Sequence, residues 1–174
     1  MKRITAFLVI VGLFFSISNC FATKINYQDS GLGISILLPS TWTLTSSKGS
    51  RFFYGKNIIL FSIQKAGVST SEINSWKKNH LGLANSFAIE YAKGFSQGVT
   101  SIHPTRVKNY TKLPYKAAKV IYKGHSGNTK IKTAQIIIIK NKKLYLLTGF
   151  AKLKKFDESN TKYFAPVFQS FRLL

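Results

Sequence analysis

Four consecutive isoleucines, Ile136 to Ile139, place the strongest constraint on the fold of this chain. They lie within the segment from Thr129 to Lys140, and side chains alternate between the two faces of a strand. The segment is therefore apolar on both faces, as in strands that are covered on each side. We expect it to form a central strand, with a layer of structure on either face of its sheet.

A long helix is expected before this strand. Ser69 and Glu72 have capping-box spacing, and apolar residues then recur every three or four positions. This pattern predicts a helix over residues 69–95. Gly82 lies inside it and predicts close packing or a kink at that point.

Further strands and a second helix complete the expected elements. The second helix is expected over residues 158–171, either beginning near Pro166 or kinked there. The other strands, bounded by turn residues, are expected at residues 24–29, 32–38, 51–54, 58–64, 101–110, 117–123 and 144–150.

The N-terminus has the pattern of a secretory signal peptide. Basic residues precede an apolar run, and small and polar residues follow up to Ala22. The apolar run is shorter than the roughly 20 residues that a membrane-spanning helix needs. We expect cleavage after Ala22, which leaves residues 23–174 as a single periplasmic or secreted domain without a transmembrane segment. An uncleaved anchor at residues 1–22 is the alternative.

Cys20 allows a second form of processing. The segment from Ile17 to Cys20 resembles a bacterial lipobox, in which a lipid is attached to the cysteine. Asn19 departs from that pattern, which has Gly, Ala or Ser before the cysteine. Lipidation at Cys20 would tether the protein to a membrane.

The composition argues against catalysis and against a metal site. The chain has 26 Lys+Arg but only 5 Asp+Glu, which leaves few carboxylates for acid–base chemistry. The three histidines, His80, His103 and His125, lack metal-ligand spacing, and no cysteine follows the expected cleavage site. We therefore expect no catalytic residue, no metal and no cofactor.

One segment resembles a catalytic motif. Gly124 to Asn128 approaches the nucleophile elbow around Ser126, but Asn128 stands in place of the last glycine and strands are expected on both sides. A hairpin turn is the expected structure there. The alternative function is an exported hydrolase that uses Ser126 with His125 or His103.

Three segments resemble the PsbP-like superfamily, and one of them, Leu144 to Ala151, is similar to the family's last strand. The segment from Gly33 to Trp42 is an apolar strand that ends in Pro, a small residue and Trp, and Phe168 to Arg172 resembles the terminal Ser-Phe motif. The resemblance implies an α+β fold, an α/β/α sandwich whose central antiparallel sheet is flanked by helices. The superfamily includes the extrinsic photosynthetic protein, a Ran-binding nuclear-transport factor and bacterial exported proteins, which are mostly non-catalytic accessory modules.

The excess of lysine allows two interpretations, a solvated basic surface or a surface that attracts an anionic partner. The net charge is +21, and Lys outnumbers Arg by 22 to 4, so diffuse attraction is favoured over the bidentate recognition that Arg provides. For an exported protein, anionic lipid, lipopolysaccharide or an acidic protein is expected rather than nucleic acid. A secreted cationic effector is a further alternative. The residues expected to form this surface are Lys108, Lys112, Lys116, Lys119, Lys123, Lys130, Lys132, Lys140, Lys142 and Lys143.

Overall fold

The computed structural model describes residues 23–174, apart from residues 48, 57 and 95–99. The expected signal peptide at residues 1–22, with Cys20, lies outside the described residues. Within the described part of the chain, no helix has the length and apolar character needed to cross a membrane.

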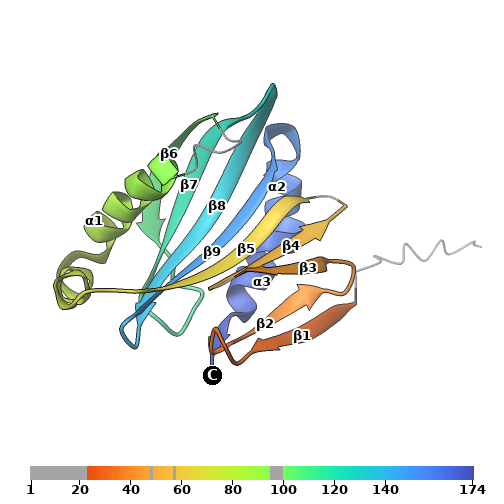
Figure 1. Cartoon of the computed structure of the whole chain (residues 1–174). Helices are drawn as coiled ribbons and strands as arrows, with labels where there is room; N and C mark the ends of the chain where they lie inside the picture. Colours follow the sequence, from red (N-terminus) through yellow and green to blue (C-terminus); the bar gives the residue numbers. More distant parts are fainter. Residues whose placement is uncertain (1–22, 48, 57, 95–99) are drawn as a thin grey trace, which may run out of the picture.

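The strands form two antiparallel sheets (Figure 1). The large sheet has the order β3-β4-β5-β9-β8-β7-β6, and the small sheet has the order β1-β2-β10. The expected strands are confirmed. Strands β3 and β10 were not expected, and the first hairpin, β1–β2, belongs to the small sheet. The bounds are β1 Lys24–Asp29, β2 Ile34–Pro39, β3 Thr43–Ser47, β4 Ser50–Gly55, β5 Ile58–Gly67, β6 Thr100–Asn109, β7 Ala117–Ser126, β8 Thr129–Lys140, β9 Lys143–Lys152 and β10 Arg172–Leu173.

Helices cover both faces of the large sheet. Helix α1, Thr70–Gly94, lies on one face, and α2, Phe156–Ser159, and α3, Ala165–Ser170, lie on the other (Figure 1). The expected C-terminal helix therefore begins earlier than residue 158. It is also irregular, because a 3-10 turn at Leu153–Lys155 precedes it and a π-helical turn at Asn160–Phe164 separates α2 from α3. Pro166 lies in the first turn of α3, directly after the π-helical turn.

The isoleucine run is covered on both faces, as expected. Ile136 and Ile138 belong to the core beneath α3, with Phe164 and Phe168, whereas Ile137 packs in the core beneath α1. Gly149 on β9 admits the Phe164 ring, since a Cβ there would lie 2.6 Å from it. The architecture is the α+β sandwich that the sequence predicts.

Helix α1 is broken at Asn79. Its backbone leaves the helical region there (φ −146°, ψ 79°), and its Oδ1 accepts a hydrogen bond from the Gly82 N–H at 2.9 Å. Asn79 thus acts as an internal N-cap for the second half of the helix. A Cβ at Gly82 would lie 2.6 Å from the Asn79 amide, so the expected close packing is confirmed and the kink lies three residues earlier. The capping box also forms, because the Ser69 N–H donates to Glu72 Oε2 at 2.6 Å.

A buried ion pair joins the two sheets. Asp29, at the end of β1, pairs with Arg51 on β4, and its carboxylate accepts hydrogen bonds from the Tyr27 hydroxyl and the Leu32 N–H, each at 2.8 Å. Lys65 on β5 donates to the Leu32 carbonyl at 3.0 Å. Each charged group at this junction therefore has a defined partner.

Candidate anion-binding groove

The helices on the two faces are offset along the large sheet. Helix α1 packs against β6, β7 and β8, whereas α2 packs against β8 and β9 on the opposite face. A groove of about 470 Å³ lies beside α2 on that face. This groove, called the basic groove below, is lined by Thr105, Arg106, Lys108, Lys119, Ile121, Lys123, Lys132, Phe156, Asp157 and Asn160.

Strand register gathers the lysines of the basic groove into two pairs. Lys108 on β6 lies directly opposite Lys119 on β7. Lys123 on β7 lies directly opposite Lys132 on β8. Lys119 and Lys123 are four residues apart on one strand, so both pairs share one face of the sheet. Like charges directly opposite each other destabilise a sheet, and the groove contains two such contacts.

Few groups compensate these charges. Lys132 Nζ lies 3.1 Å from Asp157 Oδ1 and 4.5 Å from the centre of the Phe156 ring. Lys119 Nζ donates to Asn160 Oδ1 at 3.4 Å. The Asp157 side chain is 89% exposed, so its pairing is weakened by water. Among the groove's lining residues it is the one acidic side chain.

The pKa of Lys119 reports this imbalance. Burial lowers it from the usual value, and the positive charges of Lys108 and Lys132 lower it further. The groove therefore holds Lys119 in a position where its own charge is disfavoured. A bound anion would offset the repulsion from the two neighbouring lysines.

The remaining lysines of the expected surface lie elsewhere. Lys116 Nζ donates to the Lys77 carbonyl of α1 at 3.1 Å, and Lys112 lies in the same β6–β7 connection. Lys130 lines a separate pocket near the β7–β8 turn, with Lys152, Lys154 and Lys155. The expected lysines therefore do not form one continuous surface.

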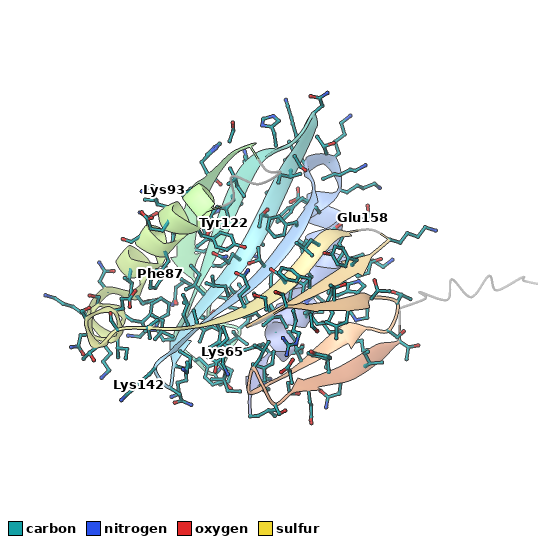
Figure 2. The ribbon with its side chains drawn as sticks, in the orientation of Figure 1. Lys65, Phe87, Lys93, Tyr122, Lys142 and Glu158 are labelled. Atoms are coloured by element: carbon teal, nitrogen blue, oxygen red, sulfur yellow. The ribbon has the colours of Figure 1, made fainter. Side chains whose placement is uncertain are left out.

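Three of the expected lysines lie at the β8–β9 turn. Lys140 is directly opposite Lys143, and Lys142 stands in the turn. Figure 2 shows Lys142 at the opposite end of the molecule from Glu158 of α2. These three are thus remote from the basic groove and provide a natural control for it.

Sequence reasoning missed part of the groove. Arg106 stands two residues before Lys108, so it shares that face of β6, and this spacing could have identified it. Asp157 and Asn160 come from the C-terminal helical segment. No local signal in the sequence places them beside β7, since their position depends on long-range packing.

Two of the three histidines have structural partners. His80 hydrogen-bonds Asn109 at 3.2 Å and packs edge-on against Trp76, and His103 hydrogen-bonds the Ser101 carbonyl at 3.1 Å. Ser126 ends β7, and a two-residue turn leads directly into β8. The strand-to-helix turn that a nucleophile elbow needs is therefore replaced by the expected hairpin. The described residues contain no cluster of three potential metal ligands.

A second polar cluster lies beneath α1. The Tyr122 hydroxyl donates to Gln135 Oε1 at 2.6 Å, and Gln135 Nε2 donates to Thr148 Oγ1 at 3.1 Å (Figure 2 labels Tyr122). Tyr91 of α1 reaches Thr148, and burial raises the pKa of Tyr91 to about 12. These groups bond one another inside the core, so their arrangement indicates a role in specifying the packing of α1.

Known structures share this fold. The sequence matches no protein-family model and no characterised protein. The cyanobacterial PsbP (CyanoP) from Synechocystis is similar, with a TM-score of 0.68 at 14% identity over 90% of this chain and 96% of that one. A Bacteroides thetaiotaomicron protein has a TM-score of 0.56 at 13% identity over 88% of this chain and 49% of its own. A Pseudomonas aeruginosa protein of unknown function, PA94, has 0.51 at 10% identity over 84% and 94%. At these identities the likeness concerns architecture, and the chain has the PsbP-like fold that its sequence predicts.

Proposed function

We propose that this protein is an exported, non-catalytic accessory module that binds an anionic component of the bacterial envelope through the basic groove. The anionic component is a lipid, a lipopolysaccharide or an acidic protein. The observation that carries this proposal is the pair of directly opposed lysine contacts, Lys108 with Lys119 and Lys123 with Lys132. The export pattern of residues 1–22 and the small number of acidic residues also support it.

The physical basis is the relief of repulsion. Without a ligand, four lysines face one exposed carboxylate, Asp157. An anion between the lysines adds attractive interactions that offset the repulsion between them. Each lysine contributes about 1 kcal/mol at most near an anionic surface, and salt screens this contribution.

The test compares two variants with the same loss of charge. One carries Lys108→Gln, Lys119→Gln, Lys123→Gln and Lys132→Gln. The control carries Lys24→Gln, Lys140→Gln, Lys142→Gln and Lys143→Gln, which are all exposed and outside the groove. Binding of residues 23–174 is measured against anionic phospholipid vesicles, lipopolysaccharide and polyglutamate at several salt concentrations.

We expect the groove variant to lose at least tenfold in affinity for one of these probes at low salt, while the control loses less than threefold. Equal losses in the two variants would show that net charge alone drives binding. Absence of binding to all three probes at low salt would also contradict the proposal.

A further inference from the structure

The pocket beside the β7–β8 turn combines lysines with an exposed leucine. It has a volume of about 670 Å³, and its lining includes Lys130, Lys152, Lys154 and Lys155 together with Leu153. Strand register brings these residues together, because Ile131 at the start of β8 lies directly opposite Lys152 at the end of β9. The basic end, as these five lining residues are called below, lies at the opposite end of β8 from the β8–β9 turn (Figure 1).

The leucine of the basic end is exposed although it is apolar. Leu153 begins a 3-10 turn that has no buried residue, and 38% of its surface is accessible. Single exposed leucines are common on protein surfaces, but lysines precede and follow this one in the chain and line the same pocket. Such a combination binds the headgroup region of a bilayer, where the apolar group enters the acyl boundary and the ammonium groups meet the phosphates.

The lysines of the basic end have little compensation within the protein. Lys155 Nζ lies 2.9 Å from Glu158 Oε2, but both side chains are more than half exposed, so water weakens this pair. In the described part of the chain, no ion pair involves Lys130, Lys152 or Lys154. Lipid phosphates can supply the missing counter-charge, and each of these lysines adds to the attraction of an anionic surface.

We propose that the basic end docks on an anionic lipid bilayer, with Leu153 at the boundary between headgroups and acyl chains and the lysines among the lipid phosphates. A purely acidic protein segment would satisfy the lysines but would leave Leu153 without an apolar contact. This docking goes beyond the proposed function, because none of the residues involved lines the basic groove.

An indole introduced at residue 153 tests the insertion. The native Trp42 and Trp76 are buried, so Leu153→Trp adds an exposed indole to a constant background. Residues 23–174 are mixed with vesicles of phosphatidylglycerol and phosphatidylcholine whose acyl chains carry bromine, which quenches indole fluorescence on contact. We expect a blue shift and quenching in Leu153→Trp. The matched control, Leu37→Trp, should show neither, because Leu37 is 41% exposed but lies on β2 of the small sheet, away from the basic end (Figure 1).

Charge substitutions at the two ends of β8 test the electrostatic attraction. One variant carries Lys130→Gln, Lys152→Gln and Lys154→Gln. The control carries Lys140→Gln, Lys142→Gln and Lys143→Gln, which remove the same charge at the β8–β9 turn. At low salt, we expect the first variant to lose about tenfold or more in affinity for the anionic vesicles and the control to lose less than about threefold. Circular dichroism and the unfolding midpoint check that both variants remain folded.

A smaller substitution measures the apolar contact alone. Leu153→Ala keeps every charge and should lower the affinity for the vesicles about threefold, because less apolar surface leaves water. An unchanged affinity would show that no insertion occurs and would overturn the proposal.

Other outcomes also decide the proposal. Absence of quenching in Leu153→Trp, or equal losses in the two lysine variants, would overturn it. Binding to polyglutamate that depends on these lysines, without binding to vesicles, would identify an acidic protein as the partner and overturn it too. The variant with the four groove lysines replaced separates this docking from the proposed function. If that variant binds every probe as the parent does, the proposed function fails, whereas quenching in Leu153→Trp would still support docking through the basic end.

Discussion

The charged side chains near the two ends of the large sheet are arranged in opposite ways: at one end they are paired with opposite charges, and at the other like charges face each other. At the β4–β5 end, the buried Asp29 has an ion pair with Arg51 and hydrogen bonds from Tyr27 and Leu32. At the β6–β7 end, the basic groove sets lysine against lysine, with the exposed Asp157 as its acidic residue. The first arrangement stabilises the fold, whereas the second lowers its stability and is suited to an external anion.

The largest expected effect is at the Asp29 end. Asp29→Asn should lower the free energy of unfolding by about 3 kcal/mol, because Arg51 is left partly buried without its counter-charge. Urea denaturation at pH 7 measures this change. The matched control, Asp157→Asn, should change stability by less than about 0.5 kcal/mol because its side chain is exposed. Similar losses in both variants would remove the contrast between the two ends.

The pH dependence of the free energy of unfolding should also depend on Asp29. Burial alone would raise the pKa of Asp29, but the hydrogen bonds from Leu32 and Tyr27 and the charge of Arg51 hold it below the usual value. Its folded pKa is thus below its unfolded pKa, so its stabilisation is present above pH about 4 and is lost as pH falls further. Urea midpoints from pH 7 to pH 2 should fall less steeply in Asp29→Asn than in the parent.

Two other carboxylates should account for the pH dependence of stability that remains in Asp29→Asn. Hydrogen bonds from Ser69 lower the pKa of Glu72, and a hydrogen bond from Lys155 lowers the pKa of Glu158. Their contributions have the same sign as that of Asp29 and persist after the substitution. An acid profile identical to that of the parent would mean that Asp29 does not control acid stability.

A smaller effect of opposite sign is expected in the basic groove. Lys119→Gln with Lys123→Gln removes one member of each opposed pair and should raise the free energy of unfolding by about 1 kcal/mol at low salt. The gain should largely disappear in 1 M salt, where charges are screened within about 3 Å. Urea denaturation at both salt concentrations measures it, and a loss of stability would argue against repulsion in the groove.

The smallest effect is expected at the β8–β9 turn. Lys140→Gln relieves the contact with Lys143, but both residues are exposed, so the gain should be only about 0.3 kcal/mol. The same denaturation series measures it. A gain as large as that in the groove would indicate that burial does not distinguish the two locations.

The sequence predicts those parts of the fold that depend on local patterns. The run Ile136 to Ile139 identifies the covered strand, and Ser69 with Glu72 identifies the start of α1. Strand β3 was missed because Thr43–Ser47 is exposed throughout and lacks an alternating pattern. Gly82 predicts close packing or a kink; the close packing is confirmed, whereas the kink lies at Asn79, whose side chain caps the second half of the helix.

The candidate site was predicted only in its residue types. The sequence identifies lysine-rich strands, but the opposition of Lys108 to Lys119 depends on register, which the pairing of β6 with β7 sets. The separation of Lys130 from Lys132 depends on how residues 152–160 pack against the sheet, since Lys130 lies beside Lys152–Lys155 and Lys132 lies beside Phe156 and Asp157. Both follow from contacts between residues distant in sequence.

The break at Asn79 also gives α1 two macrodipoles in place of one. The first half of the helix ends just before Asn79, so its unpaired carbonyls form a negative pole near Lys77 and Lys78. Lys116 donates to the Lys77 carbonyl at that pole. Lys77 and Lys78 stand in the last turn before this break and Lys116 bonds one of its carbonyls, so part of the chain's positive charge lies where it favours a helix end.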